Sequence, residues 1–214
     1  MLRRAAVLLA VLAIVAPASA VGAATTDLSA AQRATLLGYA RDTWASFVAM
    51  TDAGSGLPAD ALNADGTTSV QTSTTNIGAY MWSAVVAERL GIINHAEIVA
   101  RLGRTLHSLE TMERDQTVGA DGRPSGQYYN WYDHRTGAKL TAWPSTGDPL
   151  TPILSSVDNG WLATGLQVVR NTVPEVADRA GAIYDSMDFG FYYRPAVNRI
   201  AVPPCAGTVH RSPP

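Results

Sequence analysis

Long polar loops alternate with pairs of closely joined helices, and this alternation constrains the fold more than any single motif does. Residues 51–74 and 116–154 are rich in Asp, Gly, Ser and Thr and show no apolar period, which is typical of long loops. Between them, helical patterns follow one another across a short turn, so the two helices must form an antiparallel hairpin. In a ring of such hairpins the long loops gather on one face, at the N-termini of every second helix. We expect the functional residues on that face.

Five helices are predicted from apolar spacing and from capping residues. The first begins with the capping sequence at Ser29 and carries apolar residues at helical spacing to about Met50. The fifth is expected to be capped by Thr172 and to open at Pro174. A small β-hairpin is expected around Thr136-Gly137. The three remaining helices are predicted at 75–91, 94–112 and, from Ser155 or Ser156, to about 170.

The N-terminus has the pattern of a cleavable secretory signal. Arg3 and Arg4 precede an uncharged apolar run from Ala5 to Ala16, and small residues then give an A-x-A site ending at Ala20, with a second possible cut near Ala24. The apolar run is too short to span a bilayer, although an uncleaved anchor is an open alternative. We therefore expect residues 1–24 to be removed and the remaining protein to be secreted, with no membrane attachment after cleavage.

Composition and motif searches argue against several classes of function. The net charge is −2, and there is no Lys/Arg cluster of the kind that binds nucleic acid. The single cysteine, Cys205, excludes an intramolecular disulfide. The four histidines lack metal-ligand spacing, and no nucleotide-binding or G-x-S-x-G motif is present, so neither a metal nor another cofactor is expected.

Three segments on the expected functional face combine aromatic rings with Asn, Ser, Thr and Asp. Polyhydroxylated ligands require this mixture, because rings stack on C–H faces while amides and carboxylates bond hydroxyls. The predicted partner is therefore a polysaccharide or oligosaccharide. The segments are 72–78, 129–133 and 155–161.

Asp133 and Asp158 are the acids best placed for proton chemistry in these segments. Glycoside hydrolysis generally needs one carboxyl to protonate the leaving oxygen and another to act as base or nucleophile. Each residue also has a purely structural interpretation. Ser155 and Asp158 fit a capping box, in which the carboxylate suits the helix dipole, and Asp133 can hold a turn.

The aromatic and amide residues have the same two interpretations. Trp131, Trp143 and Trp161 could pack in the core or among the loops, and core packing is favoured for Trp161 because it lies in an apolar helical stripe. Asn76 could serve only as a helix-start residue. The hypothesis of a sugar site therefore depends on the segments meeting in space.

The motifs Thr74-Thr75-Asn76-Ile77-Gly78-Ala79-Tyr80, Tyr129-Asn130-Trp131-Tyr132-Asp133 and Ser155-Ser156-Val157-Asp158-Asn159-Gly160 resemble those of the glucoamylase-like bacterial family. That family includes endo-β-1,2-glucanases and the processing domain of cyclic β-1,2-glucan synthases. The resemblance runs from about Leu28 to Tyr193. It implies an (α/α)6 toroid that acts on glucosidic bonds without a metal. By motif, Asn76, Asp133, Asp158 and Asn159 would line the cleft, and Tyr128, Trp131, Tyr132 and Trp161 would be platforms or walls. The candidate catalytic residues, from their proton chemistry, are Asp133 and Asp158, and the candidate substrate contacts are Asn76, Tyr128, Asn130, Trp131, Tyr132, Asn159 and Trp161.

The resemblance also implies a fold longer than this chain. A complete toroid of this type has twelve helices, whereas apolar spacing predicts about five. We therefore expect an all-α fold, a partial and truncated (α/α)6 toroid built of helical hairpins. Proline-rich sequence without a period fills the end of the chain and suggests a frameshifted or prematurely ended tail from about Asn198. The predicted divisions are a signal peptide at 1–24, the N-terminal half of a toroid at 25–193 and an irregular tail at 194–214.

The functional hypothesis at this point is a secreted glycoside hydrolase-like protein, in an incomplete form. It would act on a β-glucan, with β-1,2-glucan favoured, by carboxylate acid/base catalysis. The alternative is a non-catalytic glycan-binding or degenerate protein that keeps the aromatic cleft. A terpene-cyclase-like toroid is disfavoured because the sequence has no DxDD or DDxxD run.

Overall fold

The computed structural model describes residues 27–119 and 122–200 of the 214-residue chain. Within these residues the fold is mostly helical, as expected, and the helix boundaries differ from the predicted ones by one or two residues. The predicted signal peptide at 1–24 and the predicted tail beyond residue 200 lie outside the described residues. The α-helices are α1 Ala30–Met50, α2 Thr74–Arg89, α3 His95–Thr111, α4 Ser156–Thr172 and α5 Pro174–Asp185.

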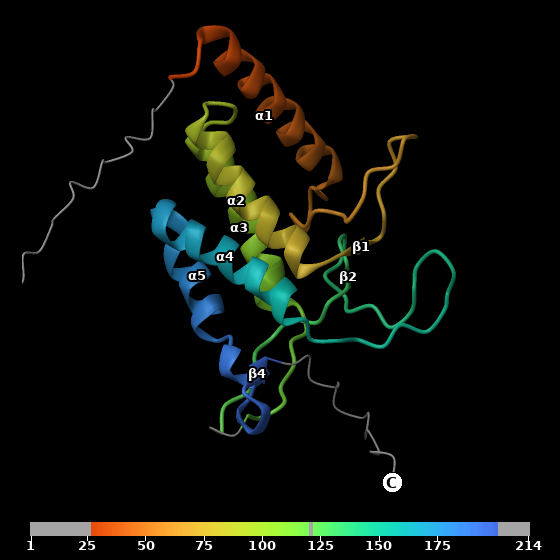
Figure 1. The fold of residues 1–214 in the computed structure, drawn as a ribbon. Coiled ribbons are helices and arrows are strands. Elements are labelled where there is room, and N and C mark those ends of the chain that lie inside the picture. Colours follow the sequence, from red (N-terminus) through yellow and green to blue (C-terminus); the bar gives the residue numbers. More distant parts are fainter. Residues whose placement is uncertain (1–26, 120–121, 201–214) are drawn as a thin grey trace, which may run out of the picture.

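The helices form two antiparallel hairpins, α2–α3 and α4–α5, with α1 leaning against α2 (Figure 1). The α2–α3 turn is tight because Gly91 adopts a positive φ of 67°, a conformation that glycine reaches without strain. Helices α2 and α4 pack against each other more extensively than any other pair. They are therefore the centre of the fold, and α3 and α5 lie behind them.

Helices α2 and α4 approach to backbone contact at two glycines. A Cβ atom built on Gly78 would lie 2.3 Å from the carbonyl oxygen of Trp161, and one built on Gly165 would lie 2.6 Å from the carbonyl oxygen of Gly78. Real Cβ atoms essentially never come so close to backbone atoms. This contact fixes the N-terminal turns of the two helices relative to each other.

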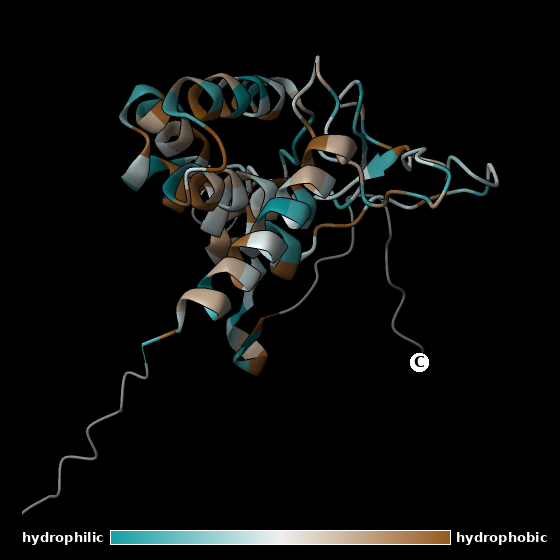
Figure 2. Cartoon of the chain, turned by 90° about the horizontal axis from the view of Figure 1, so that it is seen from above, coloured by the Kyte–Doolittle hydropathy of each residue, from teal (hydrophilic) through white to brown (hydrophobic). Residues whose placement is uncertain are grey.

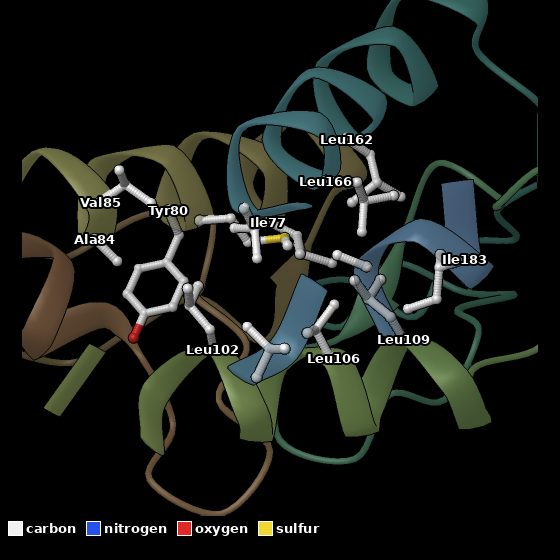
Figure 3. Close-up of a cluster of buried hydrophobic side chains, with 14 of the residues drawn as sticks. Ile77, Tyr80, Ala84, Val85, Leu102, Leu106, Leu109, Leu162, Leu166 and Ile183 are labelled. Atoms are coloured by element: carbon white, nitrogen blue, oxygen red, sulfur yellow. The ribbon is translucent and has the colours of Figure 1, made fainter. Parts of the chain in front are cut away.

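A single apolar core lies between α2, α3, α4 and α5 (Figure 3). The spacing of apolar residues that predicts each helix also explains its buried face, since positions three and four apart point the same way. Burying these side chains supplies the main driving force for folding. The labelled core residues are Ile77, Tyr80, Ala84 and Val85 from α2, Leu102, Leu106 and Leu109 from α3, Leu162 and Leu166 from α4, and Ile183 from α5.

Helix α1 is attached by few contacts. Trp44 is its one buried residue; it stacks on Tyr80 with ring centroids 5.9 Å apart, and the guanidinium of Arg101 lies 5.3 Å from the Trp44 ring. Leu36, part of the stripe that predicted this helix, is 51% exposed. The stripe therefore predicts the helix correctly but not a packed face.

Side chains cap the helices largely as expected. Ser29 forms a capping box with Gln32, and Ser73, Asn94 and Ser155 each accept the backbone N–H three residues on. The predicted cap at Thr172 is wrong. Its hydroxyl donates to the carbonyl of Val168 (2.6 Å), and α5 begins at Pro174, where the missing N–H costs nothing.

The long loops are built of narrow fingers closed by isolated antiparallel bridges. The bridges join Leu62 to Thr68, Val118 to Pro124, Tyr132 to Lys139 and Ala142 to Pro149. Each finger contains a glycine with positive φ near its tip, at 66, 122, 137 and 147. The hairpin expected at Thr136-Gly137 is therefore confirmed.

Short strands connect the loops and form the end of the described chain. Strand β1 (Gln71–Thr72) pairs antiparallel with β2 (Tyr132–Asp133), which ties the two long loops together. After α5, a 3-10 turn η1 (Phe189–Tyr192) precedes an exposed hairpin. The tail predicted to be irregular is thus ordered as far as residue 200, as β3 (Tyr193–Arg194), the 3-10 turn η2 (Pro195–Val197) and β4 (Arg199–Ile200).

His95 joins three helices by ion pairs at the short-turn end of the molecule. Its Nδ1 lies 3.2 Å from Glu88 of α2, and its Nε2 lies 2.9 Å from Glu175 of α5. The hydrogen bond to Glu175, and secondly that to Glu88, raises the pKa of His95 above its ordinary 6.5. The imidazolium therefore stabilises the folded state fully below pH 6.5, and this contribution is lost as the pH rises through the raised pKa.

Replacing His95 with glutamine is expected to remove this pH dependence. Between pH 6 and pH 9, the urea midpoint of the wild type should fall by more than the urea midpoint of His95→Gln. The difference between the two falls should be small, because the His95 ring is half exposed. His107→Gln is the matched control. His107 is exposed on the same helix, and its distance to Glu110, 3.9 Å, is longer than either ion-pair distance of His95. Parallel pH profiles for wild type and His95→Gln would contradict the expectation.

Candidate functional site

The three polar and aromatic segments lie together at the N-terminal ends of α2 and α4. The β1–β2 pairing places the start of α2 beside the second segment, and the α2–α4 contact at Gly78 places it beside the third. The long loops extend from this end of the helices (Figure 1). The hydropathy colouring shows teal polar stretches on these loops (Figure 2).

The carboxylate of Asp158 joins residues from all three segments. The Thr75 hydroxyl donates to its Oδ1 (2.5 Å). The amide of Asn130 satisfies its neighbours in one orientation, with its nitrogen donating to Asp158 Oδ2 (2.5 Å) and its oxygen accepting from Trp131 Nε1 (2.8 Å). A carboxylate has about four acceptor positions, so each oxygen can still accept a bond from a ligand hydroxyl.

The structural role proposed for Asp158 is also present. Its backbone N–H bonds to Ser155 Oγ (3.2 Å), the capping interaction read from the sequence. This places the side chain in the first turn of α4, where the helix dipole favours a negative charge. Capping by the backbone leaves the partly exposed carboxylate available, so the two roles are compatible.

Asp60 is a second carboxylate at this end of the molecule, and the sequence motifs did not single it out. Its Oδ1 accepts from Asn76 Nδ2 (3.2 Å), and the backbone N–H of Asn76 bonds to Ser73 Oγ. Asn76 thus acts as a helix-start residue whose amide also holds the loop acid. Asp60 and Asp158 are therefore attached to consecutive residues of α2, 76 and 75. The sequence offered one clue to this role of Asp60, namely that it is an acidic residue in a long loop.

Asp133 lies in β2 with its carboxylate directed to a turn. Its Oδ1 accepts from the backbone N–H of Arg135 (2.8 Å), and its carbonyl accepts from Gly137. This is the turn-holding role that was open at the outset. No interaction between Asp133 and Asp158 is seen among the described residues, and a catalytic role for Asp133 stays a prediction.

Three residues expected to contact the sugar are buried beneath the site. Tyr128 and Tyr132 are fully buried; their hydroxyls donate to the carbonyls of Leu109 and Glu113 (2.7 Å each), and burial raises both pKa values. Asn159 is also fully buried and bonds to both backbone groups of Tyr128. These side chains cannot contact a ligand here, so we correct their assignment from sugar contacts to supports of the site.

Two aromatic pairs reach the surface of the site. Trp131 packs on Trp143 with centroids 5.6 Å apart, and Trp161 packs edge-on against Trp82 at 5.1 Å. The apolar stripe of this helix favoured core packing for Trp161; that prediction is wrong, because the side chain is 41% exposed. The α4 backbone meets α2 at this level, which leaves no space behind Trp161 and turns its ring outward.

A groove of about 720 Å³ continues from Trp82 along α2 and α4. Trp161 lies one helical turn after Asp158, and Thr164 and Gln167 follow on the same helix toward the other end. The groove is apolar for most of its length. Its lining consists of Trp82, Val85, Val86, Arg89, Ala163, Thr164, Gln167, Val168, Asn171, Thr172 and Tyr184.

Hydrogen bonds to backbone carbonyls hold the base of the first long loop. Ser55 Oγ donates to the carbonyl of His134 (2.5 Å), Ser108 Oγ to that of Ser55 (2.6 Å) and Thr105 Oγ1 to that of Gly56 (2.8 Å). His134 is buried and bonds to the carbonyl of Val70. The loops that surround the site are thus fixed to α3 and to each other.

Two features are absent from the described residues: a cluster that could hold a metal ion and a helix that could span a membrane. In residues 27–119 and 122–200, no group of three or more His, Cys, Asp and Glu side chains is placed to hold a metal ion. Over the same ranges no helix combines the length and the apolar character needed to cross a membrane.

Comparison with known proteins supports a shared fold. The model of a family described as "Protein of unknown function (DUF3131)" matches residues 38–191. The curated proteins include none that matches this sequence. Among solved structures, a candidate glucoamylase of Bacteroides fragilis superposes with a TM-score of 0.60 at 17% identity, covering 82% of this chain and 43% of its own.

Two similar structures are glucanases. An endo-β-1,2-glucanase of Chitinophaga pinensis, in complex with sophorotriose and glucose, has a TM-score of 0.59 at 16% identity, covering 80% of this chain and 42% of its own. A β-1,2-glucanase of Parabacteroides distasonis gives 0.54 at 19% identity, covering 74% and 22%. Identities this low establish the fold alone. The chain spans about two fifths or less of the length of these structures.

Proposed function

We propose that this chain, which belongs to the DUF3131 family of proteins of unknown function, is an exported glycoside hydrolase-like domain that forms half of an (α/α)6 toroid. Its ligand is a β-1,2-linked glucose oligomer, bound at the N-terminal ends of α2 and α4. The Asp158 carboxylate acts in acid/base cleavage of the glycosidic bond. The basic N-terminal residues and the apolar run after them support export.

One observation carries the proposal: Asp158 joins all three segments. Its oxygens accept bonds from Thr75 and Asn130, and Asn130 in turn accepts from Trp131. A pre-positioned carboxylate beside partly exposed indole rings suits a sugar, which offers hydroxyls at its edge and C–H groups on its face. The C. pinensis enzyme, solved with sophorotriose and glucose, supports the choice of ligand.

Binding without cleavage is the second candidate function. The turn bond of Asp133 favours it, because this bond occupies one oxygen of the acid that was expected to work with Asp158. Hydrolysis generally needs two carboxyls on either side of the bond. Under this candidate the same site would hold the sugar, and Asp158 would only accept hydroxyl bonds.

Replacing Asp158 with asparagine should weaken sophorotriose binding roughly tenfold or more, since a hydrogen bond to a charged group contributes about 1.5–3 kcal/mol. Calorimetric titration of the purified protein measures this loss. Asp178→Asn is the matched control, because Asp178 is exposed on α5. A wild-type protein that binds neither sophorotriose nor longer β-1,2-glucan would refute the proposed ligand.

Reducing-end release from linear β-1,2-glucan separates the two candidates. Release that disappears in Asp158→Asn and persists in Asp178→Asn supports catalysis. Asp133→Asn tests whether the turn residue takes part in cleavage. The amide oxygen of Asn can still accept the turn bond from the N–H of Arg135. A purely structural Asp133 therefore predicts an unchanged rate per folded molecule, whereas a catalytic Asp133 predicts loss of release. Sugar binding without release supports the non-catalytic candidate.

A further inference from the structure

Two tryptophans on the second long loop stand outside the hydrophobic core. Trp131 and Trp143 belong neither to the buried core nor to the partly buried residues that pack against it, whereas Trp44 belongs to the core. Both side chains are partly exposed. Aromatic side chains contribute large apolar areas wherever they are buried. A pair of indole rings that the core does not use is therefore a surface that a ligand can cover.

The backbone of Trp143 is held by its own finger. This finger closes at the bridge between Ala142 and Pro149. The N–H of Trp143 donates to the carbonyl of Asp148 (2.9 Å), and the carbonyl of Trp143 accepts from the N–H of Gly147 (2.8 Å). The loop after β2 extends beyond the ends of the helices (Figure 1). The position of Trp143 is thus fixed before a ligand arrives, which lowers the entropy lost on binding.

A chain of contacts joins the Trp143 ring to the carboxylate of the site. The ring centroids of Trp143 and Trp131 are 5.6 Å apart, and the two planes are inclined by 59°. The Nε1 of Trp131 donates to the amide oxygen of Asn130, and the amide nitrogen of Asn130 donates to Asp158. An indole has one N–H, so Trp131 directs its only polar group toward the site. Trp131 can cover at most one face of Trp143, whose partial exposure leaves flat ring surface open beside the site.

We propose that Trp143 is a specificity-determining residue, whose ring stacks on a glucose unit beyond the unit that Asp158 holds. This inference rests on the proposed function, which supplies the ligand and the position of the first unit. The carboxylate accepts bonds from hydroxyls at the edge of one sugar ring, and the indole covers the C–H face of another. Asn130 and Trp131 lie between the two groups in the chain of contacts, so the two groups meet different units of one oligomer. Trp143 therefore adds affinity for the oligomer and none for free glucose.

Titrations of the purified protein with sophorotriose by calorimetry, and with glucose by ligand NMR, test the proposal. Trp143→Leu keeps apolar bulk but has no flat face, so it should weaken sophorotriose binding about fivefold and leave glucose binding unchanged. Trp143→Phe keeps a flat ring and should retain most of the wild-type affinity. Leu62→Ala is the matched control, since it removes an exposed apolar side chain from a finger of the first loop, and it should bind both sugars as the wild type does.

Three results would overturn the role of Trp143. They are wild-type sophorotriose affinity in Trp143→Leu, equal losses in Trp143→Leu and Trp143→Phe, and an equal loss of glucose and sophorotriose binding in Trp143→Leu. Circular dichroism and urea midpoints establish that each variant is folded. Each of these results, with sophorotriose binding intact in the wild type, leaves the proposed ligand in place.

Failure of the proposed function gives a different pattern. A wild type that binds neither sugar removes the ligand, and the stacked unit with it. Asp158→Asn separates the two residues, because it should weaken the binding of both sugars, whereas Trp143→Leu should weaken that of sophorotriose alone.

Discussion

Alanine at Gly78 or at Gly165 is expected to destabilise the protein by about 3 kcal/mol or more, the upper part of the range for overpacked sites. The new Cβ atoms would lie 2.3 Å and 2.6 Å from backbone oxygens of the neighbouring helix, which no change of side-chain rotamer can relieve. The helices must separate, and the bond from Thr75 to Asp158 must lengthen or break with them. Urea unfolding and sophorotriose titration should therefore both change.

Gly160→Ala is the matched control on α4. A Cβ atom there meets nothing within 4 Å, and removing a glycine from a helix interior should stabilise the protein by up to about 1 kcal/mol. Opposite signs for Gly160→Ala and Gly165→Ala would identify the helix contact as the cause. Equal effects at all three glycines would mean that helix propensity alone explains them and that α2 and α4 are not in backbone contact.

Asn159→Ala should lower the free energy of unfolding by about 2–4 kcal/mol, because two buried backbone groups lose their hydrogen-bond partner. Asn159 accepts from the N–H of Tyr128 (3.0 Å) and donates to its carbonyl (2.8 Å), all in fully buried surroundings. Unpaired buried groups lose their hydration without compensation. Asn171→Ala, at an exposed position of the same helix, should change stability by less than about 0.5 kcal/mol.

Asn159→Asp should make the loss depend on pH. A carboxyl buried against carbonyl oxygens has a folded-state pKa above its ordinary value of about 3.9, because burial and the neighbouring oxygens disfavour the charged form. Its protonated form is therefore tolerated at low pH, and stability falls as the pH rises through the raised pKa. Denaturation profiles between pH 3 and pH 8 measure this, and a loss that does not vary with pH would place residue 159 at the surface.

The helices were predictable because their signals are local. Ser29, Asn94 and Ser155 mark helix starts by hydrogen bonds within one turn, and these bonds form as expected. Thr172 failed as a cap because Pro174 begins α5 without one. Apolar spacing also located the buried faces of α3 and α4, where core residues recur at every turn.

The site was predictable as a meeting of segments but not as a set of side-chain roles. Tyr128 and Trp161 illustrate the limit. The motifs made both of them sugar contacts, while the apolar stripe favoured core packing for Trp161; the structure buries Tyr128 and exposes Trp161. Trp161 lies where α4 meets Gly78 of α2, and Tyr128 is held by Asn159 and by the carbonyl of Leu109. These partners come from distant parts of the chain, so local sequence patterns do not reveal them. Asp60 escaped notice for the same reason, since only the folded loop brings it to Asn76.

In the long loops, the residues at the base are held by hydrogen bonds, whereas the residues at the tips of the fingers project into solvent. Bonds from Ser55, Thr105 and Ser108 secure the base of the first loop, while residues 63–66 near the tip of one finger are exposed. A binding surface organised this way loses little freedom when a ligand arrives. Mutations at the tips can also alter which ligand is accepted without endangering the scaffold, so related chains can diverge in preference while retaining one architecture.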